Sequence, residues 1–153
     1  MKRLLLFLAA LASAMPASAG VALHAATRSF EIGSDSLFYC FFSTVSANLE
    51  PGGWGSRFPT LMRLYEGRVA AADLALLRKE LAATRSELKT LPLSKIVWNF
   101  EHRDLQPPWG NNINGNITDL SNYFVTSDGK DLFETLFQAI AEAERQKVPI
   151  EVE

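Results

Sequence analysis

The chain has 153 residues, of which 48% are hydrophobic and 21% charged, and its formal net charge at pH 7 is −2. A chain of this length is expected to form one domain with a core of its own. Acidic and basic residues are interleaved without a basic stripe, which argues against a nucleic-acid-binding protein. Cys40 is the only cysteine, so no internal disulfide can form and stability has to come from packing.

Residues 1–19 have the pattern of a cleaved secretory signal peptide. Lys2 and Arg3 precede an apolar stretch, residues 4–14, and small residues of a cleavage site follow it. The stretch is shorter than the roughly 20 apolar residues that span a membrane. The alternative is an uncleaved N-terminal helix. We expect a periplasmic mature domain, residues 20–153, with no stable membrane insertion and, after loss of two basic residues, a net charge of −4.

The first half of the mature chain predicts one strand and then helices. Residues 20–32 alternate in polarity, which predicts one strand or a strand bent near residues 27–29. Apolar residues at three- and four-residue spacing predict a helix over residues 35–49, and a glycine-rich stretch ends it. Pro59 opens a short helical turn. A longer helix is predicted from about Asp73 to Thr90, with a charged outer face in solvent.

The second half predicts strands around one more helix. Residues 96–100 are rich in β-formers and predict a central strand, and residues 123–125 predict another. Asp131 is expected to cap an amphipathic helix. Residues 148–152 predict a terminal strand that suits a sheet edge, where it could pair with another chain; the oligomeric state stays open. About three helices and four or five strands in mixed order predict a single α+β domain with a small mixed or antiparallel sheet.

The strongest enzymatic pattern is Glu101, His102 and Asp104, a general base with flanking carboxylates in a loop. Such residues are common in surface loops, and adjacent residues at a strand end point to different sides. Ser43 and Ser121 lack the glycine-flanked turn of a hydrolase nucleophile. We therefore expect no catalytic residues and no enzyme.

Metal and anion sites are also weakly indicated. Asp128 and Asp131 could bind calcium, although a turn before a capped helix explains them more simply. Lys130 and the start of that helix could hold an anion, but no phosphate-binding glycine loop accompanies them. One cysteine and two separated histidines give no zinc spacing, and Cys40 is expected to be a buried, inert thiol. We expect no metal and no cofactor.

Two loops, residues 52–58 and 107–112, combine aromatic, glycine and polar residues. Trp and Arg are the residue types that become anchors in protein interfaces. The candidate binding residues are Trp54, Arg57, Pro107, Pro108, Trp109, Asn111 and Asn112. The alternative is structural, with Trp109 closing the end of the core and Asn111 and Asn112 closing backbone turns.

Five segments together carry a resemblance that covers roughly residues 21–152. They are FFSTVSANLE, WGSRFPTLMRLYEG, KIVWNFE, QPPWGNNI and ITDLSNYFVTSDGKDLFETLFQAI. In order and spacing they resemble the immunity protein 70 family of bacterial polymorphic toxin systems. The resemblance implies a small non-enzymatic antitoxin that binds a cognate toxin and blocks it by occlusion. It transfers no toxin-contact residue to this sequence.

The predicted leader departs from that family, whose members mostly begin at the first strand. An exported immunity protein implies a toxin that acts in the cell envelope, and a mildly acidic chain favours a basic partner. An alternative from another class is a small periplasmic carbohydrate-binding protein or hydrolase. There Trp54 and Trp109 would be sugar platforms, and Glu101, His102 and Asp104 the acid and base.

Overall fold

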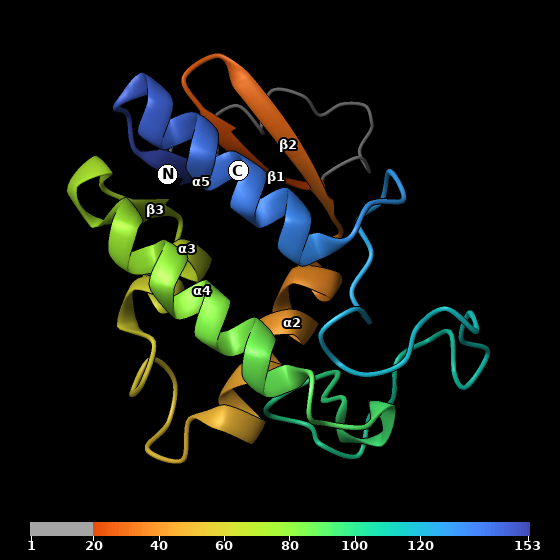
Figure 1. Ribbon diagram of the computed structural model, residues 1–153. Helices are drawn as coiled ribbons and strands as arrows, with labels where there is room; N and C mark the ends of the chain where they lie inside the picture. Colours follow the sequence, from red (N-terminus) through yellow and green to blue (C-terminus); the bar gives the residue numbers. More distant parts are fainter. Residues whose placement is uncertain (1–19) are drawn as a thin grey trace, which may run out of the picture.

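The computed structural model describes residues 20–153, so the predicted leader lies outside the described residues. One antiparallel sheet has the strand order β2-β1-β4-β3, which brings the two ends of the described chain together (Figure 1). Its strands are β1 (Val21–Ala25), β2 (Arg28–Gly33), β3 (Arg68–Val69) and β4 (Ile150–Val152).

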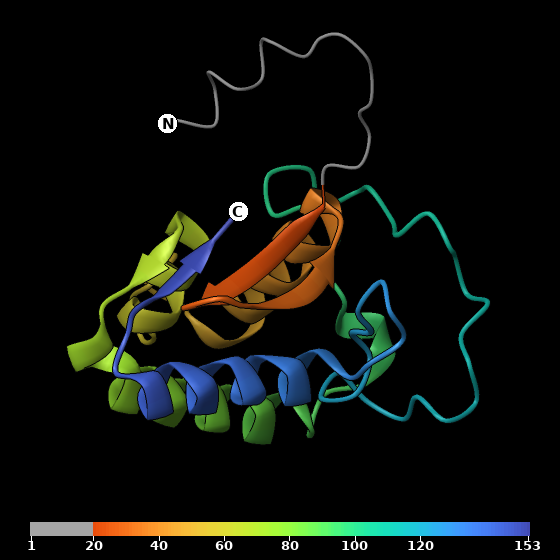
Figure 2. The ribbon, with the colours of Figure 1, turned by 90° about the horizontal axis from the view of Figure 1, so that it is seen from above.

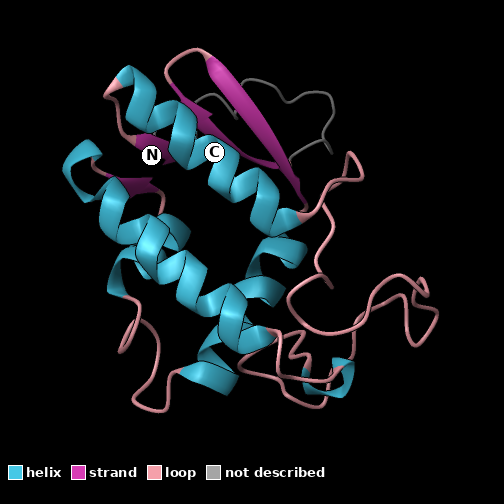
Figure 3. Cartoon of the chain, viewed as in Figure 1, coloured by secondary structure: helices cyan, strands magenta, loops and turns pink. Residues whose placement is uncertain are grey.

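Within residues 20–153, four helices accompany the sheet, and short 3-10 turns precede and follow α4 (Figure 3). The helices are α2 (Asp35–Leu49), α3 (Pro59–Glu66), α4 (Leu74–Leu88) and α5 (Leu132–Gln146), and the turns are η1 (Ala71–Asp73) and η2 (Leu93–Lys95). The α+β class is confirmed, with α3 a full helix in addition to the three long ones. Among residues 20–153 no helix has both the length and the apolar character needed to cross a bilayer.

The first strand prediction needs correction, because residues 20–32 form a hairpin. Ala25 pairs with Arg28 across a two-residue turn, and Val21 pairs with Gly33. Ala26 makes the turn with a φ of +58°. Alternation continues through both strands, so the pattern alone did not show where the chain reverses.

The sheet buries one face only. Leu23, Ala25 and Ile150 point into the core, whereas His24 and Glu151 face outward. Helix α5 packs across β1 and β2 on the buried side, and α4 lies antiparallel to α5 (Figure 2). At the centre of the core, the Phe41 ring of α2 meets the rings of Phe124 and Phe133 edge-on, with centroids 5.2 and 5.4 Å away.

The predicted central strand at residues 96–100 is wrong, because this segment is irregular and held by side chains of α2. The Thr44 hydroxyl donates to the Val97 carbonyl at 3.2 Å and accepts from the Val97 N–H at 3.1 Å. The Phe100 N–H donates to the Ser43 hydroxyl at 3.1 Å. These hydroxyls satisfy the backbone groups that a neighbouring strand would otherwise satisfy.

Two further strand predictions are corrected. Residues 123–125 contribute only an isolated bridge between Val125 and Asp131. The terminal strand is shorter than predicted and lies inside the sheet, between β1 and β3. Pro149 is tolerated there because it precedes the first paired residue, so its missing N–H removes no ladder bond. The partner β3 has two residues, too few to give a periodic signal in the sequence.

Candidate interaction surface

The first candidate loop, residues 52–58, is organised by Glu50, whose side chain the sequence did not single out. Glu50 is only 6% exposed. Its carboxylate accepts the backbone N–H groups of Gly55, Arg57 and Phe58 at 3.0, 3.2 and 3.0 Å. Three N–H bonds to one carboxylate fix the loop and the N-terminus of α3, whose N-cap residue Phe58 has no side-chain acceptor.

Glu80 of α4 completes the capping of α3. Its buried carboxylate accepts the Leu61 N–H at 2.8 Å. The prediction that the charged face of this helix is wholly solvated is therefore wrong at Glu80. A carboxylate near a helix N-terminus is favoured by both the unpaired N–H groups and the helix dipole.

Trp54 lies on this loop and is half-buried in an aromatic cluster. Its ring stacks on Tyr39 of α2 at 6.0 Å with an interplanar angle of 10°. It also meets Phe100 edge-on at 5.0 Å and lies 5.9 Å from Tyr65 of α3. Trp54 therefore supports neighbouring rings and does not present an open platform for a sugar.

Arg57 is committed to contacts within the chain. Its guanidinium makes a two-pronged contact with Glu87 of α4, at 2.8 and 2.7 Å, and donates to the Leu49 carbonyl at 3.1 Å. The hydrogen bond from Arg57 holds the pKa of the Glu87 carboxyl below its ordinary value. This contact ties the loop to α4 and occupies the group predicted to anchor a partner.

Trp109, in the second candidate loop, is fixed but remains 39% exposed. Its indole N–H donates to the Tyr123 hydroxyl at 2.7 Å, and its ring meets Trp98 edge-on at 5.4 Å. Burial raises the pKa of Tyr123, partly offset by the Trp109 hydrogen bond, so the phenol stays protonated at neutral pH. The ring is thus held in one orientation while part of it faces solvent.

An apolar pocket of about 480 Å³ opens beside Trp109, between the start of α2 and the loop that precedes α5. Its apolar lining comes from Leu37, Trp109, Ile113, Ile117, Tyr123 and Val125. The polar side chain of Asn112 also lines this pocket. Pro107 and Asn111 line a second pocket of about 520 Å³, and both pockets are lined by Ile113 and Tyr123. Pro108 is exposed. The two candidate loops therefore do not build one site.

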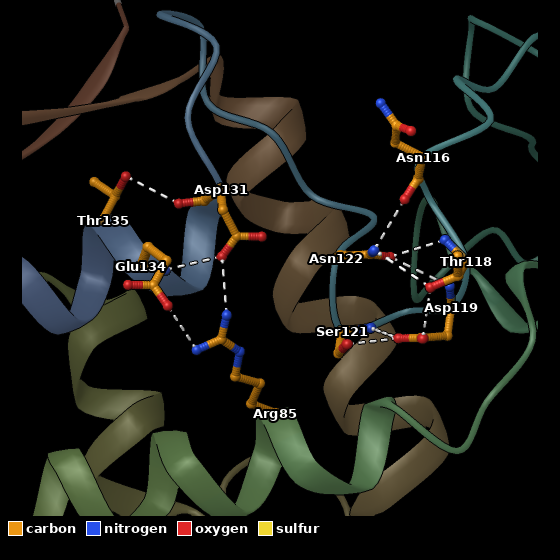
Figure 4. A network of polar contacts seen from close by, with 9 residues as sticks. All are labelled: Arg85, Asn116, Thr118, Asp119, Ser121, Asn122, Asp131, Glu134 and Thr135. Atoms are coloured by element: carbon orange, nitrogen blue, oxygen red, sulfur yellow. Dashed lines mark hydrogen bonds and ion pairs between the residues drawn. The ribbon is translucent and has the colours of Figure 1, made fainter.

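A network of polar contacts holds the turn at residues 116–122 (Figure 4), which contains Ile117 of the pocket lining. The Asn122 side chain accepts the backbone N–H groups of Thr118 and Asp119 and donates to the Asn116 carbonyl. Burial alone would raise the pKa of Asp119, but hydrogen bonds from Ser121 and Thr118 outweigh it and lower that pKa. The wall is built from satisfied polar groups and presents its apolar side chains to the pocket.

Comparison with known proteins identifies the family. Residues 23–152 match the family described as Immunity protein 70. The chain belongs to the immunity protein 70 family. No curated protein and no solved structure matches the chain.

The alternative catalytic residues are not arranged as a site in this member of the immunity protein 70 family. Glu101, His102 and Asp104 are exposed, and among residues 20–153 their side chains share no hydrogen bond or ion pair. The turn itself is held by Asn99, whose side-chain oxygen accepts the N–H groups of Glu101 and His102. A general base oriented by a partner is the arrangement that acid–base catalysis uses, and this loop does not show it.

The segment before α5 of this immunity protein is a turn that leads into a capped helix, which is the simpler of the two alternatives considered for Asp128 and Asp131. Asp131 caps α5 by accepting the Glu134 N–H at 3.0 Å, and Arg85 of α4 reaches Asp131 and Glu134 at 3.5 and 2.9 Å (Figure 4). Asp128 contacts Thr126 and lies 3.6 Å from Lys130. In the described part of the chain, no three His, Cys, Asp or Glu side chains are grouped to hold a metal ion.

Cys40 is fully buried, as predicted from the sequence. Burial raises the pKa of its thiol to about 12, although a hydrogen bond with Thr44 opposes the shift. A thiol is nucleophilic only as the thiolate. In this immunity protein Cys40 therefore contributes to the core as a small apolar group.

Proposed function

We propose that this immunity protein neutralises one cognate bacterial toxin by binding it, with the apolar pocket beside Trp109 at the centre of the contact. The single observation that carries this proposal is the exposed apolar surface there. Trp109 is 39% and Val125 44% exposed, and both line the pocket. A fixed aromatic ring beside an open apolar pocket is typical of the centre of a protein interface.

The proposed contact has the usual anatomy of an interface. An apolar side chain of the toxin enters the pocket, and the polar groups of Ser34, Asn112 and Ser127 lie at its margin. Because the Trp109 N–H is already bonded to Tyr123, the ring loses no hydrogen bond to water when a partner covers it. An interface of standard size, about 1,600 Å² in total, extends well beyond this pocket.

The compartment is a further part of the proposal. The leader pattern of residues 1–19 supports export, and protection must be present where the toxin acts. We therefore infer a toxin that acts in the cell envelope, for example on peptidoglycan or membrane lipid. N-terminal sequencing after fractionation tests this, since an intact leader on a protein in the cytoplasmic fraction overturns it.

Growth protection tests the binding function. The full chain is co-expressed with the toxin encoded by the neighbouring reading frame, and growth is recorded. We expect protection by the wild type and by His102→Ala, and loss of protection by Trp109→Ala. Because Trp109→Ala also removes a hydrogen bond, Val125→Asp on the exposed margin provides a second variant. A wild type that gives no protection refutes the function, and protection by both folded pocket variants refutes the contact.

A further inference from the structure

An open groove of about 790 Å³ lies on the other side of the first turn of α2 from the apolar pocket. It is bounded by the starts of α2 and β1, the ends of α3 and β4, and the turn at residues 99–102. Figure 2 shows the start of β1 and the end of β4 on the same side of the molecule. Ser34 and Leu37 face the pocket, whereas Asp35 and Phe38 face the groove, so the two surfaces adjoin.

The groove has an aromatic floor made by Tyr39 and Tyr65, whose rings lie 6.2 Å apart. Both rings contact Trp54, and Tyr65 also stacks on Phe38 at 5.7 Å. The Tyr39 hydroxyl donates to Asn99 at 3.4 Å. The floor is therefore held in place by the core, with both Tyr side chains partly open to solvent.

Four carboxylates surround this floor, and His102 is the only basic side chain among the lining residues. They are Asp35, Glu66, Glu101 and Glu153. Ion pairs occupy many other carboxylates of the chain, such as Glu87 with Arg57 and Glu144 with Arg78. Within residues 20–153, none of the four carboxylates of the groove has an ion-pair partner.

The position of the Glu66 charge is not explained by the stability of the fold. Glu66 is the last residue of α3, where a negative charge opposes the helix dipole and costs stability. Burial raises the pKa of Tyr65 most, the neighbouring Tyr39 raises it further, and the charges of Asp35 and Glu101 act in the same direction. The negative field of the rim therefore reaches the aromatic floor, where it favours a cation.

We propose that this groove receives a lysine- or arginine-bearing segment of the cognate toxin, with its cationic side chain over Tyr39 and Tyr65 and between the carboxylates of Glu66 and Glu101. The inference rests on the proposed function and names a chemistry for the toxin surface. An aromatic face attracts a cation, and a carboxylate accepts charge-assisted hydrogen bonds from a guanidinium or ammonium group. The apolar pocket and the acidic groove adjoin at the first turn of α2, so a toxin surface that covers this turn contacts both.

The test measures binding of the toxin from the neighbouring reading frame to purified full-length immunity protein by calorimetry at low and high salt. Glu66→Lys and Glu101→Lys are expected to weaken binding at least tenfold each, and wild-type binding is expected to weaken as salt rises. Glu144→Lys is the matched control, because it reverses a charge on α5 outside the groove, and it should bind within about threefold of the wild type.

Thermal melting separates a binding effect from misfolding. Glu66→Lys should melt at or above the wild-type temperature, because a positive charge at the end of α3 is favourable. A toxin Arg→Glu or Lys→Glu substitution that restores binding to Glu66→Lys would identify the paired side chain. If wild type protects and binds but the two groove variants bind as tightly as Glu144→Lys, the groove inference fails alone. If wild type neither protects nor binds, the proposed function fails and the inference with it.

Discussion

Loss of the Glu50 carboxylate should lower the stability of the fold strongly. Its carboxylate accepts three backbone N–H groups from residues 55–58 and is almost completely buried. The substitution Glu50→Gln keeps the volume but replaces one acceptor oxygen by an NH₂ group. That group faces N–H donors, so at least one donor is left without a partner and the remaining bonds lose their charge assistance.

The magnitude follows from those bonds. A hydrogen bond to a charged group contributes about 1.5–3 kcal/mol, and an unsatisfied buried donor costs about 1–3 kcal/mol. Because the three bonds share one carboxylate, their losses do not add, and we expect Glu50→Gln to lower the free energy of unfolding by about 3 kcal/mol. Glu87→Gln is the matched control. It acts on the same loop through the exposed pair with Arg57, which contributes at most about 1 kcal/mol.

Urea unfolding followed by tryptophan fluorescence provides the assay, since Trp54 lies in this loop. The midpoint should fall strongly for Glu50→Gln and slightly for Glu87→Gln, with similar slopes for both. Equal losses for the two variants, or a loss below about 1 kcal/mol for Glu50→Gln, would refute the view that the buried carboxylate organises the loop.

Three further predictions concern single side chains. Lys147 ends α5 with a φ of +61°, so Lys147→Gly should raise the free energy of unfolding by about 1 kcal/mol in a urea titration, while Lys147→Ala should not. Cys40, with its pKa raised to about 12, should react with a thiol reagent at pH 8 only after unfolding; fast labelling of the folded protein would contradict this. Hydrogen bonds lower the pKa of Asp119, so its ionised carboxylate stabilises the folded protein at neutral pH, and this stabilisation is lost as the pH falls through the folded-state pKa. Asp119→Asn should therefore reduce the loss of stability in acid. An acid melting curve that is unchanged by the substitution would count against this role.

The long helices could be predicted because their signals are local. Asp131 caps α5 as predicted, Ser34 caps α2, and apolar spacing marks the buried faces of both helices. The segment at residues 96–100 could not be predicted, since β-forming residues there are held by hydroxyls of Thr44 and Ser43, more than 50 positions away.

The candidate site was also predictable only where the signal was local. The exposed Trp109 and Asn112 do line a pocket, and their loop was recognisable by composition. The internal ion pair of Arg57 could not be recognised from the sequence, because its partner Glu87 lies on α4, far along the chain. The acidic groove had no signal at all, since its carboxylates come from four separate segments and meet only through the fold.

The acidic side chains of this immunity protein fall into two groups with different physical roles. Glu50, Glu80 and Glu142 are buried, and each accepts hydrogen bonds from backbone or side-chain donors, so their charges stabilise the fold. The carboxylates around the groove are exposed and have no ion-pair partner within residues 20–153, and Glu66 also opposes the dipole of α3. Neutralising Glu66 should therefore be stabilising, whereas Asp35 lies in the first turn of α2, where its negative charge is favourable. We therefore expect these exposed carboxylates to act in binding, because a basic toxin surface is drawn toward an acidic groove on a chain of negative net charge.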